Sequence, residues 1–523
     1  MQDLPLGLET FSTLRENDYL YVDKTKYIFK LLKPGKRYFL SRPRRFGKSL
    51  LISTIEELFK GNKEIFKDLF IYKQWNWDKI HPVIKLDFGA GEYTNYKELK
   101  ESLYDSLEDI AEDFQIELKR RTLVGRFREL IKKVSIENDT KVVVLIDEYD
   151  KFIIDNINNP TLLKDITTLL KNFYGVLKTS DEYIEFLFVV GVSKFSGTSL
   201  FSGFNSPDDI TLDYKYASIC GISQEELEMN FSKHIEEAAK TLQCTKNDLL
   251  DNLKKWYNGY TWDGEETLYN PNSILKFFNK KCFDNYWFAT GTPSFLIEKI
   301  KYDFKPLIEE IEVESTLLDS SDPLNIDEIS LLFQTGYLTI KNKDTSGRVK
   351  YTLGIPNMEV EESLFERLLS TINDKSIAEI QEAKKEFIKN IENKNPQGLR
   401  KTIKDYVLTE IPYQIHIPHE HFYHGLFIIW LKTLGFKILA EDSTNQGSID
   451  CVLKTKTETV VIELKHSKTN EKKDLEDGIK RAFSSINDKK YFEKYLKEKN
   501  LNLLAITFNK KDVLCEFRKS KTF

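Results

Sequence analysis

A glycine, a lysine and a serine follow one another near the N-terminus, in a setting that could bind phosphate. They end the segment Ser41-Arg-Pro-Arg-Arg-Phe-Gly-Lys-Ser49, which follows the apolar run Tyr38–Leu40 and leads into another apolar stretch. At such a strand–loop–helix junction, backbone N–H groups cradle the phosphates, the lysine reaches the β/γ oxygens and the hydroxyl ligates Mg²⁺. We therefore expect Gly47, Lys48 and Ser49 to bind a nucleotide and its Mg²⁺.

The arginines of this segment leave its role open. Arg42 stands where the pattern G-x-x-x-x-G-K-[ST] has its first glycine, and a Gly-Lys-Ser triplet also occurs by chance. Arg44 and Arg45 could contact phosphate or an adjacent element, and the sequence does not distinguish the two. The segment therefore needs support from elsewhere in the chain.

Two carboxylates after another apolar strand supply that support. Val142–Ile146 is a continuous apolar run followed by Asp147 and Glu148, the form of a Walker B element. In such an element the aspartate holds Mg²⁺ and the glutamate polarises the attacking water. A third run, Phe186–Val192, ends in Ser193, whose hydroxyl could contact the γ-phosphate. The competing interpretations are a core strand followed by solvated acids, and a plain polar strand end.

A second group of chemical side chains lies near the C-terminus. Gly447–Leu453 and Val460–Lys465 are typical of two adjacent strands, which would place Asp450 beside Glu463, with Lys465 on the same face. Two carboxylates bind a hard divalent metal, which can orient a water and stabilise charge on a phosphodiester while the lysine positions the nucleophile. The alternative is a solvated sheet edge, because Asp…Glu-x-Lys is a weak pattern in a chain that is 30% charged.

The elements that must position the first group alternate between strands and helices over the first 220 residues. Near-continuous β-branched and aromatic runs predict strands buried on both faces of a parallel sheet, with helical stretches between them. This alternation is typical of an α/β fold. The expected strands are Arg37–Leu40, Val83–Phe88, Val142–Ile146 and Phe186–Val192, and the helices between them include Leu50–Phe59 and Tyr96–Leu118.

The rest of the chain divides into a mostly helical region and a second α/β region. Ser223-Gln-Glu-Glu226 has the form of a capping box, and the polar stretch Asn393–Gly398 indicates a boundary. The helices expected before this boundary are Asn247–Tyr257, Ile274–Asn279, Ile326–Gln334 and Glu359–Asn390. The elements expected after it are helix His421–Leu434, strands Gly447–Leu453 and Val460–Lys465, helix Asp474–Leu496 and strand Leu501–Phe508. We predict domains at residues 1–220, 221–400 and 401–523.

Composition excludes several classes of protein. The chain of 523 residues is 41% hydrophobic, so wholesale disorder is excluded, and its longest apolar runs are too short to span a bilayer. Five scattered cysteines without a CxxC pair fit a reducing cytosol, and no secretory signal is visible. With 77 basic and 82 acidic residues the net charge is −5. A protein of this charge would contact nucleic acid through a local patch.

Two further clusters near the C-terminus have open interpretations. His416, His419, His421 and His424 could be imagined as a transition-metal site, although packing, capping or phosphate contact fits their place at a helix start better. A group of basic side chains could track phosphates or form the solvated face of an amphipathic helix. Its members are Lys465, His466, Lys468, Lys472, Lys473, Lys480, Arg481, Lys489, Lys490 and Lys494.

Longer stretches around the phosphate loop closely resemble the bacterial AAA-ATPase-like family. The matching motifs are Leu4–Phe11, Leu14–Thr25, Tyr38–Ser49, Asp208–Asp213, Cys220–Ile222, Trp256–Tyr260 and Tyr269–Pro271. In that family Arg-Pro-Arg-Arg-Phe-Gly-Lys-[Ser/Thr] is the usual loop, so Arg42 is a family trait. The resemblance covers roughly residues 4–300 and implies a P-loop NTPase core that uses ATP and Mg²⁺.

The C-terminal region resembles the PD-(D/E)XK nuclease superfamily, in the version often fused behind the AAA-like domain. The match runs from about Pro412 to Phe508 and implies a restriction-endonuclease-like α/β domain with Asp450, Glu463 and Lys465 at its site. The segment that begins at Glu420 is similar to the first helix of that family, in which a glutamate faces the metal. Ser485 stands where a related helix often carries glutamine, which puts that helix's contact with the site in doubt.

Together these features predict a cytoplasmic bacterial ATPase and Mg²⁺-dependent nuclease. Nucleotide state would regulate phosphodiester cleavage of nucleic acid, DNA rather than RNA, and the chain could form a homo-oligomer. The alternative is a nucleotide-dependent switch or interaction protein whose nuclease fold no longer cleaves. Ser485 and the net acidity favour the alternative, whereas the intact Asp450, Glu463 and Lys465 favour the nuclease.

Overall fold

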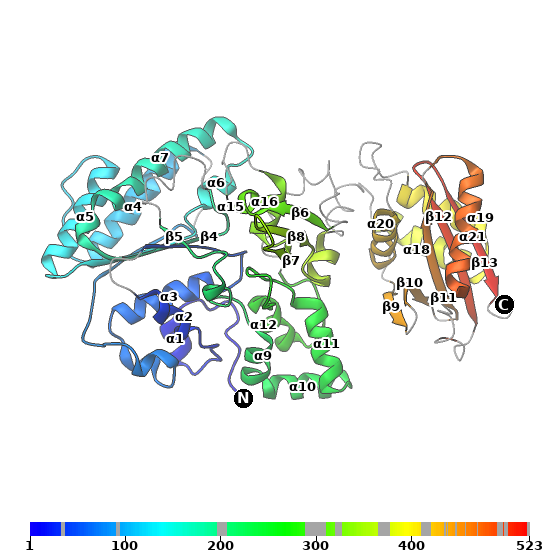
Figure 1. The fold of residues 1–523 in the computed structure, drawn as a ribbon, viewed down its shortest axis with the longest axis horizontal. Coiled ribbons are helices and arrows are strands. Elements are labelled where there is room, and N and C mark those ends of the chain that lie inside the picture. The colour runs from blue at the N-terminus through cyan, green and yellow to red at the C-terminus, as the bar shows by residue number, and fades with distance from the viewer. Residues whose placement is uncertain are drawn as a thin grey trace. The chain divides into compact units, whose positions relative to one another are not determined.

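The contacts of the chain divide it into two compact units, whose described parts lie within residues 1–361 and 362–519 (Figure 1). The first unit holds a five-stranded sheet, a group of helices and a small three-stranded sheet, and the second holds another five-stranded sheet with its helices. The computed structural model describes residues 1–32, 37–89, 95–195, 207–287, 310–319, 327–364, 377–408, 420–433, 436, 438–444, 447–455, 457–467, 469–488, 495 and 500–519.

The main sheet of the first unit is parallel, with strand order β2-β3-β4-β1-β5. Its strands are β1 (Arg37–Ser41), β2 (Val83–Asp87), β3 (Val142–Asp147), β4 (Ile184–Gly191) and β5 (Asp208–Asp209). The four strands expected from apolar runs are confirmed. Because all neighbours are parallel, the carboxyl ends of β1, β3 and β4 meet at one edge, where ligands bind in open α/β sheets.

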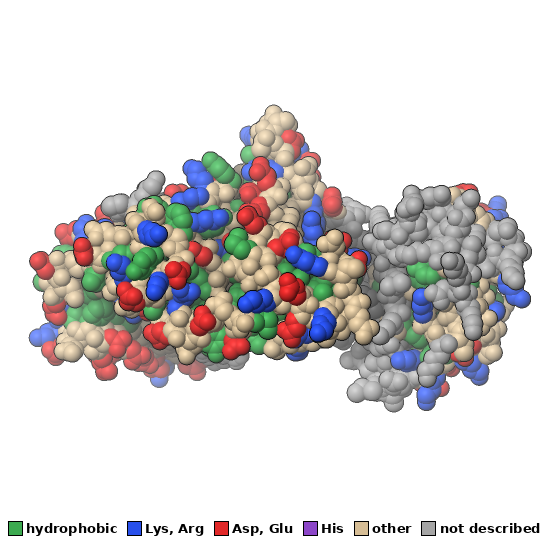
Figure 2. Space-filling model, turned by 90° about the horizontal axis from the view of Figure 1, so that it is seen from below, with side chains coloured by type: hydrophobic (Ala, Val, Ile, Leu, Met, Phe, Trp, Pro, Cys, Tyr) green, Lys and Arg blue, Asp and Glu red, His purple; other side chains and the backbone are tan. Residues whose placement is uncertain are grey.

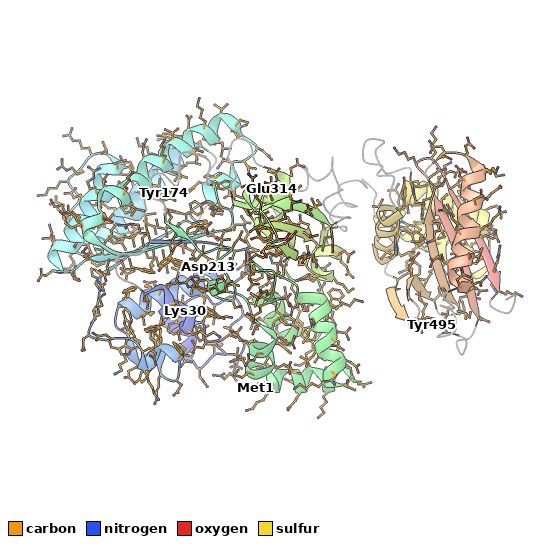
Figure 3. All side chains as sticks on the ribbon, in the orientation of Figure 1. Met1, Lys30, Tyr174, Asp213, Glu314 and Tyr495 are labelled. Atoms are coloured by element: carbon orange, nitrogen blue, oxygen red, sulfur yellow. The ribbon has the colours of Figure 1, made fainter. Side chains whose placement is uncertain are left out.

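Helices cover both faces of this sheet, which is why its strands carry continuous apolar runs. Figure 1 shows α1 to α3 on one side and α4, α5 and α7 on the other. Tyr174 of α7, labelled in Figure 3, is fully buried, and its hydroxyl donates to the carbonyl of Tyr149 just after β3. The helices are α1 (Phe11–Glu16), α2 (Thr25–Leu31), α3 (Lys48–Phe59), α4 (Tyr96–Asp113), α5 (Leu123–Glu137), α6 (Lys151–Asp155) and α7 (Pro160–Thr179).

Four helices follow the sheet and share one apolar core with the N-terminal segment around Leu20. They are α9 (Gln224–Asn230), α10 (Ser232–Leu242), α11 (Lys246–Tyr257) and α12 (Pro271–Lys280). The predicted capping box at Ser223 is confirmed, since its side chain and that of Glu226 each accept a backbone N–H of the other. The helices therefore begin where the sequence indicates.

A small antiparallel sheet in this region was not predicted. Its strands are β6 (Ile311–Glu314), β7 (Thr339–Asp344) and β8 (Lys350–Gly354), in the order β6-β8-β7, with α15 (Ser315–Asp319) and α16 (Glu328–Thr335) beside them. These strands are short and polar, so they lack the apolar runs that reveal a buried strand. The expected helix Glu359–Asn390 is present as a helical segment at 358–364 and as α18 (Ile377–Glu392), and residues 365–376 lie outside the described part.

The second unit is built on a mixed sheet with strand order β13-β12-β11-β10-β9. Its strands are β9 (Ile438–Thr444), β10 (Gly447–Lys454), β11 (Thr459–His466), β12 (Leu501–Phe508) and β13 (Val513–Lys519). β11 and β12 are parallel and the other pairs antiparallel, and β9 and β13 are additions to the predicted strands. The helices are α18, α19 (Pro396–Ile403), π-helix η6 (Lys404–Leu408), α20 (Glu420–Thr433) and α21 (Lys472–Asp488).

Charge is spread over the surface of the first unit. Figure 2 shows lysine and arginine side chains interspersed with acidic and apolar ones on the face that it draws.

None of the helices that the structure describes has the length and apolar character needed to cross a bilayer.

Candidate functional site

The predicted phosphate loop closes around its own lysine. Gly47, with φ +91°, joins the loop to α3 in a left-handed conformation that favours glycine. The Lys48 ammonium is buried and donates to the carbonyls of Arg42 and Pro43, both at 3.0 Å. Burial lowers the pKa of Lys48. A phosphate oxygen could replace these carbonyls as the partner of the ammonium.

The serine after Lys48 meets the carboxylate at the end of β3. Asp147 is 1% exposed, and the Ser49 side chain lies beside its carboxylate. Burial raises the pKa of Asp147 to about 6, and the nearby Ser49 side chain and the charge of Lys48 oppose that rise. A hydroxyl and a carboxylate are hard oxygen donors of the kind that Mg²⁺ prefers, so this pair fits the expected ion.

Further acids line the same edge. Glu148, half-buried at φ +50°, donates its backbone N–H to the Asp147 carboxylate at 2.9 Å. Asp87 at the end of β2 pairs in register with Asp147, and its charge adds to the rise of the Asp147 pKa. A Cβ added at Gly89 would stand 3.0 Å from the Asp87 carboxylate and 3.3 Å from that of Glu148. The glycine therefore leaves room for these two side chains beside Asp147.

A third acid of the β3 segment, Asp150, was not predicted to be part of the site. It is 1% exposed and accepts the backbone N–H groups of Val192 and Ser193, and burial raises its pKa to about 6. The Tyr149 hydroxyl donates to the Ser193 carbonyl at 2.8 Å. The Ser193 hydroxyl is fully buried and has no hydrogen-bond partner within the described part of the chain. The residues after Glu148 thus hold the end of β4, where Ser193 was expected to act.

In the second unit the predicted carboxylates lie on adjacent strands. Cys451 of β10 pairs with Ile462 of β11, so Asp450 stands opposite Glu463. The Asp450 carboxylate accepts the Leu464 N–H at 2.8 Å. Lys465 places its ammonium 3.2 Å from Glu463, which is 2% exposed. The three predicted side chains therefore gather around one point of the β10–β11 hairpin.

The surroundings of this hairpin are described in part. Glu420 is the first residue of α20, and its side chain lies outside the described residues, as do His416, His419 and the side chain of His421. On the same helix His424 is buried and places Nε2 3.1 Å from the Asp450 carbonyl oxygen. Ser485 is half-buried on α21. Within the described residues no three His, Cys, Asp or Glu side chains are already arranged as a metal site.

Basic side chains near the hairpin are partly engaged with the protein itself. Arg481 donates to the His466 carbonyl at 3.2 Å, and Lys480 pairs with Asp477 at 2.8 Å. Lys468, Lys489, Lys490 and Lys494 of the predicted cluster lie outside the described residues. Phosphate contact by this cluster stays a prediction.

Comparison with known proteins matches the two stretches of the chain that contain these candidate sites. A family model described as a predicted AAA-ATPase matches residues 5–201, and one described as the PD-(D/E)XK nuclease superfamily matches residues 418–517. An "Uncharacterized protein in vnfD 5'region" of Azotobacter chroococcum mcd 1 is 34% identical over 517 residues, which cover 97% of this chain and 96% of that protein. The chain belongs to the predicted AAA-ATPase family with a C-terminal PD-(D/E)XK nuclease domain.

The arginine that replaces the first glycine in this AAA-ATPase loop has a structural role. Arg42 has no exposed surface, and its guanidinium donates to the carbonyls of Thr211, Tyr216 and Ala217 as well as Ser41. It also lies over the Trp262 ring, 4.1 Å from the centroid. Burial lowers its pKa to about 10. Arg42 therefore ties the loop to the chain beyond β5.

Arg42→Lys and Arg42→Gly are both expected to lower the free energy of unfolding by about 2–4 kcal/mol. A lysine cannot reproduce the planar fork that reaches several carbonyls, and a glycine leaves those carbonyls buried without a donor. Urea unfolding of the full chain measures the change. The exposed Arg45, at φ +66°, supplies the control, because Arg45→Gly relieves an unfavourable conformation and should leave stability unchanged or raised. Equal stability of Arg42→Gly and wild type would contradict the role of Arg42.

Other residues of the AAA-ATPase loop pack against the helical region. Phe46 is fully buried and makes edge contacts with Tyr260 and Trp262, at centroid distances of 4.9 and 5.1 Å. The Arg44 carbonyl accepts the indole N–H of Trp287 at 3.1 Å. The Arg45 guanidinium lies 3.5 Å from Glu9. Phosphate contacts of the Arg44 and Arg45 side chains stay predictions.

A cavity of about 100 Å³ lies beside the loop. Its wall is mostly apolar and comes from the N-terminal segment, the loop with the start of α3, and the residues after β5. The residues that line the cavity include Leu20, Val22, Phe46, Gly47, Leu50 and Gly221. The cavity thus adjoins the point where phosphates are expected.

Proposed function

We propose that the first unit binds and hydrolyses ATP with Mg²⁺. The observation that carries this proposal is the buried Lys48, which among the described residues donates to loop carbonyls, together with the Ser49 side chain beside the Asp147 carboxylate. Mg²⁺ would be held by Ser49 and Asp147 and would neutralise charge on the phosphates. Lys48 would bind the phosphates, and Glu148 would orient and polarise the attacking water.

The remaining roles follow from position. Arg44 and Arg45 would approach the phosphates from the loop, and Ser193 would contact the γ-phosphate from the end of β4. The apolar cavity beside Gly47 suits a nucleobase, whose faces favour apolar walls over bulk water. ATP turnover of the purified full chain, compared with and without Mg²⁺, tests the assignment.

We also propose that the second unit cleaves nucleic acid with a divalent metal held by Asp450, Glu463 and Glu420. The convergence of Asp450, Glu463 and Lys465 on one hairpin supports this role. When bound, the metal would supply an activated water and stabilise charge on the phosphodiester. Lys465 would position the nucleophile. Cleavage of DNA and of RNA, each with and without Mg²⁺, identifies the substrate class.

Regulation of cleavage by nucleotide is the last element of the proposal. It predicts that the cleavage rate of the wild-type chain differs between ATP, ADP and no nucleotide. Identical rates in all three conditions would remove regulation while leaving both activities in place.

The raised pKa of Asp147 gives the nucleotide site a pH signature. Between about pH 4 and 6 the folded protein keeps a proton that the unfolded chain has lost, so Asp147 makes stability fall as pH rises through this window. Asp147→Asn removes that dependence. From pH 4 to pH 7 its stability relative to wild type should rise by about 2 kcal/mol, most of the effect expected from a shift of the pKa from 3.8 to about 6.

Urea unfolding of the metal-free proteins across this range measures the difference. At pH 7 added Mg²⁺ should stabilise wild type, because it binds the ionised carboxylate, and should leave Asp147→Asn unchanged. If the difference in unfolding free energy between wild type and Asp147→Asn does not vary with pH, Asp147 does not bind a proton in this range and the raised pKa is wrong. Equal stabilisation of both proteins by Mg²⁺ would remove Asp147 from the metal site.

A further inference from the structure

Trp287 connects the phosphate loop to the helical region. Its side chain is 1% exposed, and its indole N–H donates to the Arg44 carbonyl at 3.1 Å. A Cβ added at Gly336 would stand 2.8 Å from Pro43 and 3.4 Å from the Trp287 ring, so these three residues are in close contact. The Tyr337 ring meets the indole edge-on, at a centroid distance of 5.2 Å. The position of the Arg44 carbonyl therefore depends on where Trp287 is held.

Glu359 holds the backbone of Trp287. Its carboxylate accepts the Trp287 N–H at 2.7 Å and the Ser273 hydroxyl at 2.8 Å. Glu359 has no exposed surface, and burial raises its pKa to about 7. Burying an ionised carboxylate costs free energy unless several hydrogen-bond donors converge on it. Here α12, through Ser273, and the chain after it, through Trp287, both converge on Glu359.

The helix that carries Glu359 begins next to a segment that packs on the phosphate loop. A hydrogen bond and a close backbone contact hold the start of this helix against that segment. Asn357 donates to the Asn258 carbonyl at 2.7 Å. Gly259, at φ +102°, lies so close to Pro356 that a Cβ would stand 2.2 Å from its carbonyl oxygen. The next residue, Tyr260, packs on Phe46 of the loop. The helical region therefore reaches the loop both through Trp287 and through Tyr260.

We propose that Glu359 and Trp287 are positioning residues of the nucleotide site. Glu359 fixes the Trp287 backbone, and the Trp287 indole fixes the Arg44 carbonyl, next to the carbonyls of Arg42 and Pro43 that hold Lys48. Both residues would act through the loop backbone, because they hydrogen-bond to each other and to the Arg44 carbonyl and Ser273. The inference rests on the proposed binding of nucleotide at Lys48, and it adds that residues far along the chain set the shape of the loop.

Protonation of Glu359 should weaken this arrangement. An ionised carboxylate only accepts hydrogen bonds, which suits the N–H and O–H groups that point at Glu359. A protonated carboxyl must also donate a hydrogen bond, which suits those donor groups less well. The titratable groups that face it are Lys276 of α12, Tyr257 of α11, and Tyr260 and Tyr286. Burial raises the pKa of each of these tyrosines above its ordinary value of 10 and lowers that of Lys276 from 10.5. Glu359 is the member of this group whose pKa lies near neutrality.

The test is binding of a fluorescent ATP analogue with Mg²⁺ to the full chain at pH 6 to 8. Trp287→Phe keeps an aromatic ring but loses the indole N–H that donates to the Arg44 carbonyl, so it should weaken binding of the analogue about three- to tenfold. Trp256→Phe is the matched control, because the Trp256 ring packs on Phe283 in a tilted arrangement, at a centroid distance of 5.6 Å, and its substitution should leave binding unchanged.

Glu359→Gln resembles the protonated carboxyl and does not titrate. At pH 8 it should bind about fivefold more weakly than wild type, and at pH 6 equally, so the ratio of the two dissociation constants should fall as pH falls through 7. A purely structural role would give a ratio that does not vary with pH. That result, or wild-type binding by Trp287→Phe, would overturn the inference. If Lys48→Ala bound the analogue as wild type does, the proposed nucleotide site would fail instead.

Discussion

Lys48→Ala is expected to lower ATP hydrolysis by the full chain by about a hundredfold or more, the range found when one preorganised charge at a transition state is removed. The Lys48 ammonium is buried at the start of α3, and its partners among the described residues are two loop carbonyls. Alanine removes the positive charge that would move to the phosphates and leaves those carbonyls without a donor. Initial rates of phosphate release at saturating Mg²⁺ measure the loss.

Lys60→Ala is the control for this substitution. Lys60 follows the last turn of the same helix, is exposed and pairs with Glu56 at 2.7 Å, so its removal should leave turnover at the wild-type rate. Unfolding of both variants shows whether the fold is kept. Turnover by Lys48→Ala at the wild-type rate would place hydrolysis elsewhere and remove the proposed role of the phosphate loop.

The strands and the loop that carry this site could be predicted because their sequence signals are local. Continuous apolar runs gave β1, β3 and β4, and the glycine before Lys48 takes the left-handed conformation that the turn into α3 requires. The parallel register then follows from the α/β alternation. By contrast, β7 reads Thr-Ile-Lys-Asn-Lys-Asp and is stabilised by its neighbour β8, so nothing in its own sequence distinguishes it from a loop.

The residues that sequence reasoning missed act across long separations. Asp150 looks like one more solvated acid after Asp147, yet its partners are the N–H groups of Val192 and Ser193, more than forty residues away. In the sequence, Arg42 is visible only as a departure from the usual loop pattern. The structure explains this arginine by its hydrogen bonds to carbonyls after β5 and by its contact with the Trp262 ring. A pattern of neighbouring residues does not contain such contacts.

The C-terminal site likewise combines features that the sequence predicts with contacts that it does not. The spacing of Asp450, Glu463 and Lys465 predicts a hairpin with all three on one face, and β10 and β11 pair in that register. The hydrogen bond from the Leu464 N–H to Asp450 and the contact of His424 with the Asp450 carbonyl were not foreseen. Both depend on how α20 and the strands pack, which the local pattern does not specify.

Asp450→Asn is expected to lower metal-dependent cleavage of nucleic acid by at least about a hundredfold. The amide oxygen can still accept the Leu464 N–H, so the hairpin should keep its shape, whereas the charge that would bind the metal is lost. Glu463→Gln should have a similar effect, because Glu463 is 2% exposed and a neutral amide there cannot balance a divalent ion or Lys465. Initial rates on a labelled DNA, with and without Mg²⁺, measure both losses.

Glu458→Gln is the matched control in the same hairpin. Glu458 lies at the turn end, where its side chain accepts a hydrogen bond from Asn502, and it should leave the cleavage rate unchanged. Equal nicking by wild type and Asp450→Asn would indicate a contaminating nuclease and would favour the non-cleaving switch. In that case Asp450 and Glu463 could still bind Mg²⁺, and a Mg²⁺-dependent rise in the stability of wild type, absent in Asp450→Asn, would identify a metal site that serves binding without cleavage.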